Sequence, residues 1–271
     1  MTDQPTRKPA RMDLVFPQSE MTEFYLAKYG PVDQQGERPQ RRYKFKYYQP
    51  DDLYEALMNR MVTPGCRWLD VGGGRNVFPS NVRLAEKLAQ RAGRLVGVDP
   101  SANIHENKFV HEGHQAFIED FESDEPFDLI SLRMVAEHIT KPEAAVASIA
   151  RLLKPGGKAI IYTINLWSPL SVAAWVVPFN WHHPIKKFFW KTEEKDSFPV
   201  AYRMNTQRTL GKQMAKGGMT EVGFRRLDDL NTFSQFRFLN YCELLSWKCL
   251  HTLGLPYPEH CLLGVYEKTV L

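Results

Sequence analysis

The chain has few cysteines and none of the spacings that mark metal sites or disulfide frameworks. Its four cysteines, Cys66, Cys242, Cys249 and Cys261, form no C-x-x-C pair and no other zinc-ligand pattern. We therefore expect reduced thiols and no metal, as in a cytoplasmic protein. The first fifteen residues contain charges and proline but no apolar core, so we expect no signal peptide.

Long apolar runs and concentrated charge are missing as well. The longest apolar run, residues 166–179, has 14 residues and is interrupted by Pro169 and Pro178, whereas a membrane-spanning helix needs about 20 apolar residues. We therefore expect no transmembrane segment. The net charge is only +4, and no stretch has the concentrated basic residues of a nucleic-acid-binding face, so a nucleic acid partner is not favoured.

Strand patterns and helical patterns alternate along the chain. Strands are predicted at 68–71, 95–98, 109–110, 127–132 and 158–164, and helices start near Pro50, near Ser80 and at a capping box of Thr140 and Glu143. Two further strands flank a predicted helix near 238–253. This alternation favours an α/β fold, in which helices cover both faces of a parallel sheet and the ligand binds at the carboxyl ends of the strands.

A glycine-rich turn follows the first predicted strand, in the stretch "RWLDVGGGRN" at residues 67–76. A phosphate-binding loop of the G-x-x-x-x-G-K-[ST] type would need a lysine, and none follows Gly74 at that spacing. The dinucleotide fingerprint G-x-G-x-x-G would need glycine at position 77, where the chain has Val77. Because the third glycine allows the approach of a pyrophosphate, the sequence indicates a ligand without one.

Four segments between Trp68 and Ile164 resemble, in order and spacing, the motifs of class I S-adenosylmethionine-dependent methyltransferases. They are "LDVGGGRN", "GVDPS", "FDLISLRMVAEHI" and "LLKPGG", and the subgroup resembled is the small-molecule and lipid type, related to the quinone C-methylating enzymes. The resemblance covers the middle third of the chain well. It implies S-adenosylmethionine as cofactor and a Rossmann-like, doubly wound sheet of seven strands, mostly parallel with an antiparallel last strand.

The resemblance also assigns cofactor contacts. Gly72, Gly73 and Gly74 let the backbone pass close to the cofactor, where a Cβ would clash. Asp70 takes the position of the family's acidic residue that faces the methionine ammonium, and Asp99 is placed to accept both ribose hydroxyls. The other predicted contacts are Asn76, Pro100, Ser101, Phe117, Glu119, Arg133 and Met134.

Some of these positions depart from the family pattern. Asn76 stands where the family often has a third glycine, and asparagine tolerates the left-handed conformation. An acidic residue for the adenine amino group is missing after strand three, where the chain reads "EGHQAFIED". We expect Phe117 to cover the adenine ring, with Glu119 or backbone groups accepting from the amino group. Arg133 and Met134 are expected to line the methionine and the sulfonium.

Methyl transfer from a sulfonium requires alignment and exclusion of water rather than a dedicated catalytic motif. A hydroxyl or carbon acceptor must lose a proton, which calls for a base, whereas a carboxylate acceptor needs none. The candidate catalytic residues are His138, His182, His183 and Tyr202. For the histidines, a packed or surface side chain is the alternative, and Tyr202, with Arg203, either binds the acceptor or pins a lid to the sheet.

The flanking segments are predicted to complete the site. Residues 1–50 are expected to form an N-terminal tail and lid, and residues 51–271 the methyltransferase domain. Within that domain, an aromatic-rich insertion after strand five, residues 166–215, is expected to roof the acceptor site; a satellite core or a membrane-surface patch are the alternatives. The stretch "RRYKFKYY" at 41–48 either closes over the cofactor or forms a solvated edge.

The predicted function is S-adenosylmethionine-dependent methyl transfer to a small, apolar or aromatic molecule, at a hydroxyl or carboxylate oxygen. A nucleic-acid methyltransferase and a non-catalytic cofactor-binding subunit are the alternatives. The tetrapeptide D/N-P-P-Y/F of amino-methylating enzymes is absent after the fourth strand, which counts against nucleobase amino groups. The expected partner is a small-molecule acceptor, and the protein is expected to be a monomer or a homodimer.

Overall fold

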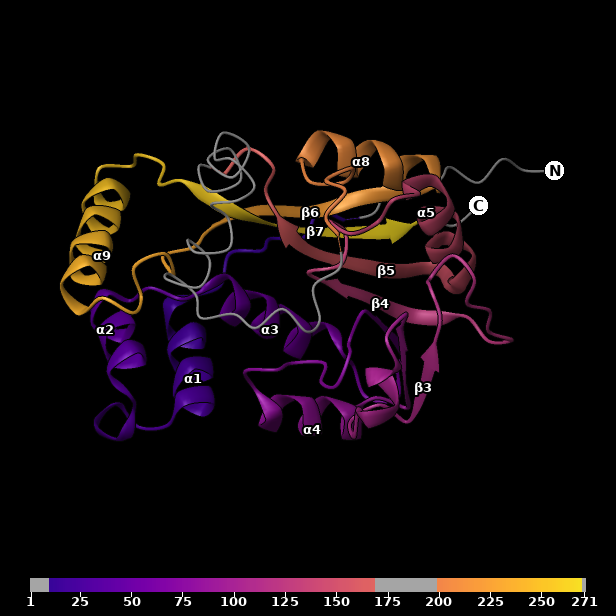
Figure 1. Cartoon of the computed structure of the whole chain (residues 1–271), viewed down its shortest axis with the longest axis horizontal. Helices are drawn as coiled ribbons and strands as arrows, with labels where there is room; N and C mark the ends of the chain where they lie inside the picture. The colour runs from indigo at the N-terminus through magenta and orange to yellow at the C-terminus, as the bar shows by residue number, and fades with distance from the viewer. Residues whose placement is uncertain (1–9, 169–198, 270–271) are drawn as a thin grey trace.

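One seven-stranded sheet organises the part of the chain that the structure describes. The computed structural model describes residues 10–168 and 199–269. The strand order is β3-β2-β1-β4-β5-β7-β6 (Figure 1). The strands are β1 Arg67–Val71, β2 Arg94–Asp99, β3 Glu112–Gln115, β4 Phe127–Arg133, β5 Leu153–Ile164, β6 Met219–Asp228 and β7 Glu259–Lys268.

Strand direction determines where a ligand can bind. Strands β1 to β5 run parallel, with Asp70 paired to Gly97 of β2 and to Ser131 of β4. Strand β7 is antiparallel to β5 and to β6, which confirms the predicted Rossmann-like sheet with its antiparallel last strand. The chain winds outward in one direction from β1 and in the other from β4. The switch point therefore lies between β1 and β4, beyond their carboxyl ends.

The third strand lies later in the chain than its apolar pattern predicts. Strand β3 spans Glu112–Gln115 rather than residues 109–110, so this prediction was wrong. The Val110 side chain packs over β2 instead, where a Cβ added to Gly97 would come within 2.8 Å of Val110 Cγ1. Because β3 is a partly exposed edge strand, its own residues are mostly polar and lack the pattern of a buried strand.

The helices begin close to the predicted signals. They include α3 Pro50–Met61, α4 Val82–Arg91, α5 Pro142–Leu152, α8 Gln207–Lys216 and α9 Arg237–Thr252. The predicted capping box at Thr140 was wrong, since α5 begins at Pro142 with Lys141 as its N-cap and no side-chain cap. Proline in the first turn is already set for the helical conformation, so it favours the start there without that cap.

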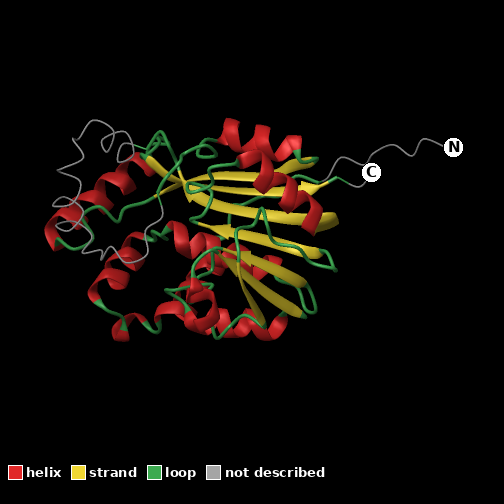
Figure 2. Cartoon of the chain, turned by 45° about the vertical axis from the view of Figure 1, so that its right-hand side comes forward, coloured by secondary structure: helices red, strands yellow, loops and turns green. Residues whose placement is uncertain are grey.

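Helices cover both faces of the sheet (Figure 2). Helices α3 and α4 pack against the face that carries Trp68, Leu95 and Ile160. Helices α5 and α8 contribute to the core on the other face. Helix α8 takes up the end of residues 166–215 and extends to Lys216, so the last part of the predicted insertion is a sheet-covering helix that packs on β6 and α5.

The N-terminal helices lie with α9 beyond the end of the sheet toward which β4 and β5 point (Figure 1). They are α1 Gln18–Tyr29 and α2 Glu37–Phe45. Arg41 Nε donates to Asn240 Oδ1 of α9 at 3.1 Å, and the Arg42 guanidinium lies 5.2 Å from the centroid of the Tyr29 ring. Because both arginines are buried, the stretch "RRYKFKYY" is not a solvated edge.

Candidate functional site

The glycine turn joins the end of β1 to β2 and to the segment after β4. The N–H of Gly72 donates to the carbonyl of Val98 at 2.7 Å. Gly72 and Gly74 have φ values of 76° and 44°, a region that only glycine adopts without strain. A Cβ added to Gly72 would overlap Val135 Cγ2. Glycine at position 72 is therefore required both by the backbone conformation and by the packing after β4.

Asp99 is held at the end of β2 by two backbone amides. Its Oδ2 accepts from the N–H of Gly74 at 3.0 Å, and its Oδ1 accepts from the N–H of Ser101 at 2.7 Å. The carbonyl of Gly74 in turn accepts from Asn107 Nδ2 at 3.0 Å. Each carboxylate oxygen has a second lone pair, so a fixed carboxylate faces the glycine turn and can accept two further hydrogen bonds.

Asp70, at the end of β1, has one paired and one unpaired oxygen. Its Oδ1 accepts from Ser131 Oγ at 2.7 Å, and Ser131 Oγ accepts from Trp68 Nε1 at 2.7 Å. The Oδ2 is buried and has no hydrogen-bond partner among the described residues. A Cβ added to Gly73 would overlap this oxygen, so glycine at position 73 keeps the space beside it open. Burial raises the pKa of Asp70 to about 7.

Asn76 does not adopt the left-handed conformation that asparagine tolerates. Among the described residues, the non-glycine positions with positive φ are Lys46, Met134 and Tyr202. Asn76 closes the turn by hydrogen bonds instead, because its N–H donates to the carbonyl of Gly73 at 3.0 Å and its Oδ1 accepts from the N–H of Phe78 at 2.9 Å. This is an asparagine turn, for which a negative φ suffices.

The residues predicted near adenine follow β2 and β3 at the same edge. The carbonyl of Pro100 accepts from Gln115 Nε2 at 3.3 Å, and Ser101 Oγ accepts from the N–H of Asn103 at 3.3 Å. Phe117 is 58% exposed. The carbonyl of Glu119 accepts from Ser148 Oγ of α5 at 3.2 Å, which ties its backbone to the helix on the other side of the loop. The N–H of Ala116 donates to the carbonyl of Asp99 at 3.1 Å, so the exposed Phe117 directly follows a residue that is bonded to the end of β2.

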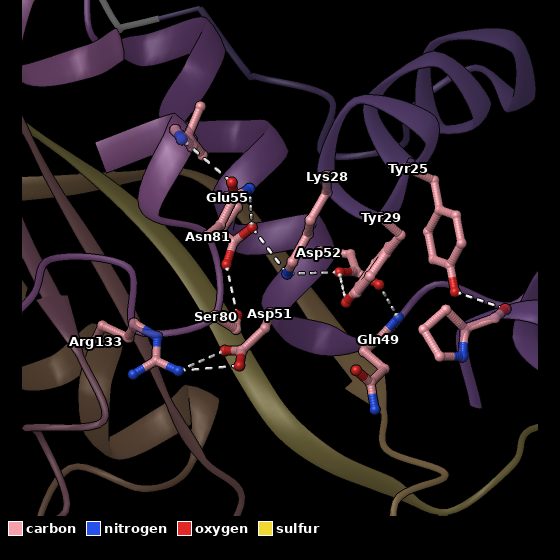
Figure 3. A network of polar contacts seen from close by, with 12 residues as sticks. Tyr25, Lys28, Tyr29, Gln49, Asp51, Asp52, Glu55, Ser80, Asn81 and Arg133 are labelled. Atoms are coloured by element: carbon pink, nitrogen blue, oxygen red, sulfur yellow. Dashed lines mark hydrogen bonds and ion pairs between the residues drawn. The ribbon is translucent and has the colours of Figure 1, made fainter. Parts of the chain in front are cut away.

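Arg133 is the last residue of β4, and Met134 follows it at the switch point. The Arg133 Nη2 donates to both carboxylate oxygens of Asp51, at 3.0 and 2.9 Å, which ties it to the start of α3 (Figure 3). Met134 has a φ of 53°, a conformation that costs a non-glycine residue about 1–2 kcal/mol. Its N–H donates to the carbonyl of Tyr162 at 2.7 Å. Strained residues of this kind concentrate at ligand sites.

Tyr54 on α3 places a buried hydroxyl near Asp70 and Arg133, because the charges of both act on its pKa. The residue is fully buried, yet its hydroxyl has no partner among the described residues. Its ring stacks on that of Tyr162, with 5.2 Å between centroids. Burial raises the pKa of Tyr54, and the charge of Asp70 adds to the rise, so the hydroxyl stays protonated and remains a donor.

The segment at Tyr202 is fastened to β5 and to the "EHI" element through Glu137. The carbonyl of Glu137 accepts from the N–H groups of Ala201 and Tyr202 at 2.6 and 3.1 Å, and its Oε2 accepts from Thr163 Oγ1 at 2.7 Å. Asn205 Nδ2 donates to the same Thr163 Oγ1 at 3.0 Å. These contacts favour the pinning role for this segment, and Arg203 is exposed.

Of the three histidines predicted as bases, His138 lies within the described residues. His138 is half-buried, and its Nδ1 lies 3.0 Å from the carbonyl of Pro199. His182 and His183 lie outside the described residues. Of the aromatic residues predicted in the insertion, Trp167 is described and is 67% exposed. Trp175, Trp181, Phe188, Phe189 and Trp190 fall outside the described ranges.

Sequence reasoning missed five residues that share this edge of the sheet: Asp51, Tyr54, Asn107, Ser131 and Glu137. In the sequence, Asp51 looks like an ordinary acidic residue in the first turn of the helix that starts at Pro50. Ser131 had a signal, because a hydroxyl in the middle of a buried apolar strand needs a partner. The others look like ordinary surface or core residues in the sequence.

Residues 10–168 and 199–269 contain neither a candidate metal site nor a membrane-spanning helix. Within these ranges no group of three or more His, Cys, Asp or Glu side chains is arranged to hold a metal ion. No helix within them has both the length and the apolar character needed to cross a bilayer.

Comparison with known proteins finds methyltransferases. Residues 26–216 match the family described as "Methyltransferase domain". The ubiquinone biosynthesis O-methyltransferase of Bradyrhizobium sp. (strain ORS 278) is 34% identical over 118 residues, which are 40% of this chain and 44% of that protein. The protein of the same name from Alkalilimnicola ehrlichii is 37% identical over 111 residues, 37% of this chain and 42% of its own. These matches span less than half the length of the relatives.

Solved structures share the fold at low identity. The cyclopropane synthase MmaA2 from Mycobacterium tuberculosis has a TM-score of 0.50 and 17% identity, over 90% of this chain and 98% of its own. The [4+2]-cyclase SpnF has a TM-score of 0.50 and 13% identity, over 80% of this chain and 81% of its own. At such identities the likeness shows the fold alone, and the two names describe different reactions.

Proposed function

Because the chain belongs to the class I S-adenosylmethionine-dependent methyltransferases, we propose that it transfers a methyl group to a hydroxyl oxygen of a small, apolar or aromatic molecule. The chain is an enzyme, and its cofactor is S-adenosylmethionine. Oxygen is proposed as the acceptor atom because the relatives named above are O-methyltransferases.

The residues at the switch point fit this cofactor. Asp70 Oδ2 is buried without a described partner and can accept from the methionine ammonium. Asp99 has the lone pairs for two ribose hydroxyls. The observation that carries the proposal is a pair of carboxylates on adjacent strands around one glycine turn. Asp70 has a buried oxygen without a described hydrogen-bond donor, and Asp99 is fixed by two backbone amides. When bound, the cofactor supplies an electrophilic methyl group on its sulfonium.

We propose the roles of the other predicted site residues from their positions along the sheet edge and in the sequence. Arg133 and Met134 would line the methionine and the sulfonium, and Phe117, with Glu119 behind it, would cover the adenine. Residues 1–50 would close the cofactor side as a lid. The part of residues 166–215 that precedes α8 would roof the acceptor. His138, His182 and His183 remain candidate bases.

Methyl transfer to acceptors of matched shape tests the function. We suggest 4-propylcatechol, 4-propylaniline and 4-propylbenzoate, which differ in the acceptor atom, together with an RNA oligonucleotide. We expect S-adenosylhomocysteine to form with the catechol, and mass spectrometry to show one added methyl on oxygen. Methylation of the aniline or the RNA alone would contradict O-methylation. Cofactor binding without turnover on any acceptor would favour a non-catalytic subunit.

Cofactor binding is expected to release a proton near neutral pH. Burial raises the pKa of Asp70 to about 7, while the hydrogen bond from Ser131 and the charge of Arg133 oppose the rise. An ammonium group prefers the ionised carboxylate, so below about pH 7 the affinity for S-adenosylhomocysteine should fall roughly tenfold per pH unit. Calorimetry in buffers of different ionisation enthalpy measures the release, which should be close to one proton at about pH 6 and absent at about pH 8.5.

The same pKa has a consequence for the unliganded protein. The folded-state pKa of Asp70 lies above its unfolded value of about 4. The contribution of this carboxyl to the free energy of unfolding is therefore greatest below about pH 4 and is lost as the pH rises through about 7. An Asp70→Asn variant should show neither the proton release nor this part of the pH dependence. Proton release that persists in the variant would contradict the assignment.

A further inference from the structure

Asp229, the residue after β6, is a carboxyl group that the cofactor turn does not use. Its Oδ1 is shielded from solvent and accepts no hydrogen bond from a described residue, although the residue as a whole is half-buried. The neighbouring carboxyl of Asp228 is engaged, because its Oδ2 accepts from Trp247 Nε1 at 2.8 Å. A shielded carboxyl oxygen without a donor requires an explanation, and a ligand is one.

The backbone around Asp229 is fixed by a single buried tyrosine. The Tyr47 hydroxyl donates to the carbonyl of Asp228 at 2.9 Å and accepts from the N–H of Leu230 at 2.9 Å. Tyr47 is 2% exposed and Leu230 is also buried. The main chain is thus clamped on both sides of Asp229, which holds its carboxyl in place.

Hydroxyl and thiol groups from other segments surround this carboxyl. Burial raises the pKa of each of them, and the negative charge of Asp229 adds to the rise for Tyr47, Tyr162, Tyr257 and Cys261. Tyr162 comes from β5 and Cys261 from β7. The Tyr162 hydroxyl lies 3.9 Å from Cys261 Sγ, and Cys261 pairs with Leu227 of β6, so these buried groups lie at the same end of the sheet as Asp229.

Asp229 lies at the same edge of the sheet as the cofactor turn. Strand β6 is antiparallel to β7, which is antiparallel to β5, so β6 ends at the carboxyl edge. Tyr162 pairs with Arg133 in the sheet and stacks on Tyr54. After burial, the charge of Asp51 raises the pKa of both Tyr162 and Asp229. Asp229 is thus on the β6–β7 side of Tyr162, with the glycine turn on the other side.

We propose that Asp229 is the general base that takes the proton from the acceptor hydroxyl, an inference that rests on the proposed O-methylation. The acceptor oxygen donates its hydrogen to Asp229 Oδ1 and uses a lone pair to bond the methyl carbon. The bond between that carbon and sulfur breaks, and its electron pair goes to the sulfur, which becomes a neutral thioether. The proton remains on Asp229 until solvent removes it.

The charges around Asp229 suit a base at neutral pH. Burial, together with the charges of Asp51 of α3 and Glu243 of α9, raises the pKa of Asp229 to about 7, although a hydrogen bond from the Asn231 N–H and the Arg42 guanidinium oppose the rise. A base is most effective when its pKa lies near the working pH. A raised pKa makes the ionised carboxylate of Asp229 a stronger base than an ordinary exposed carboxylate.

The test compares Asp229→Asn with Asp228→Asn, which removes the adjacent carboxyl on the same strand end. With 4-propylcatechol as probe, we expect kcat/KM of Asp229→Asn to fall by about 100-fold or more, with affinity for S-adenosylhomocysteine unchanged. Asp228→Asn should keep turnover within a few-fold. Asp229→Glu should retain part of the activity, because it keeps a carboxylate.

The pH profile separates a base from a structural residue. With S-adenosylmethionine saturating at every pH, kcat/KM of the wild type for the acceptor should rise about tenfold per pH unit up to about pH 7 and then level off. In Asp229→Asn this limb should be missing, and activity should instead increase toward the pKa of a phenol, about 10. Carbon-13 NMR of labelled aspartate provides a measurement that needs no turnover: a carboxyl signal absent from Asp229→Asn should titrate near pH 7.

The outcomes distinguish this inference from the proposed function. Equal turnover in the wild type and Asp229→Asn would overturn the base and leave O-methylation intact. Methylation of the aniline alone by the wild type would overturn O-methylation. Loss of S-adenosylhomocysteine binding in Asp229→Asn, or an Asp229 signal that titrates near pH 4, would overturn the base irrespective of the acceptor.

Discussion

Replacing Lys28 by methionine is expected to lower the free energy of unfolding by about 3–5 kcal/mol. The Nζ of Lys28 lies 2.8 Å from Asp52 Oδ1 and 2.9 Å from Glu55 Oε2, and all three side chains are at most 2% exposed (Figure 3). Methionine keeps the apolar length of the side chain but removes the cation. Two carboxylates are then left buried without a counter-charge, which is the costly way to break a buried ion pair.

The remaining partners cannot replace the cation. The Tyr29 hydroxyl donates to Asp52 at 2.9 Å, and Asn81 Nδ2 donates to Glu55 at 2.8 Å, but neither carries charge. Burial lowers the pKa of Lys28 and the two carboxylates raise it, and the net effect is a rise. Lys28 is therefore charged at every pH at which the protein would be studied.

Urea unfolding at two pH values measures the effect. In the variant, the uncompensated carboxyls have folded-state pKa values above their unfolded ones, so the stability they retain is present at low pH and is lost as the pH rises. The deficit relative to the wild type should therefore be larger at about pH 8 than at about pH 5. The melting temperature should fall by roughly 6–15 °C.

Arg60→Met is the matched control, because it removes a cation between the same two helices. Arg60 of α3 pairs with Glu20 of α1, and these side chains are 36% and 39% exposed. An exposed pair contributes at most about 1 kcal/mol, so this variant should lose little stability. Equal losses in the two variants would mean that burial does not determine the strength of the Lys28 cluster.

Replacing Asp99 by alanine is expected to weaken binding of S-adenosylhomocysteine by about 100-fold or more. A hydrogen bond to a charged group contributes about 1.5–3 kcal/mol, and the proposed contacts to two ribose hydroxyls would both be lost. A loss of about 1.4 kcal/mol corresponds to a factor of ten. In the wild type the N–H of Gly74 donates to Asp99 Oδ2 at 3.0 Å. The variant removes this hydrogen bond, so the glycine turn itself is loosened.

Calorimetric titration measures the affinity of each variant for S-adenosylhomocysteine, with controls for charge and for folding. Glu106→Gln removes a nearby carboxylate that pairs with Arg75 at 2.7 Å and is 63% exposed, and it should leave the affinity within a few-fold. Asp99→Asn keeps one acceptor oxygen and should fall between the two. The melting temperature without ligand reports any damage to the fold. Affinity retained in a folded Asp99→Ala variant would refute the ribose assignment, and NADH should bind none of the proteins.

The cofactor half of the site could be predicted because its residues are close together in the sequence. Asp70 lies near the end of one apolar strand, the glycine turn follows that strand directly, and Asp99 ends the next strand. In a parallel sheet the carboxyl ends of neighbouring strands meet at one edge, so local patterns were enough to bring these groups together. The third strand was misplaced because an edge strand is not required to be apolar, whereas Val110 beside it is packed inward.

The other half depended on contacts between distant segments. Lys28 meets Asp52, Asp51 meets Arg133, and Asp229 lies near Asp51, yet in the sequence each looks like an ordinary charged residue on a solvated surface. The hydrophobic periodicity of a sequence predicts which face of a helix or strand is apolar. It does not predict which charged side chain is buried when three helices pack at the edge of a sheet. The sequence by itself therefore determined the sheet and the turn, and only the tertiary structure decided which charges are buried, because burial depends on elements that are far apart along the chain.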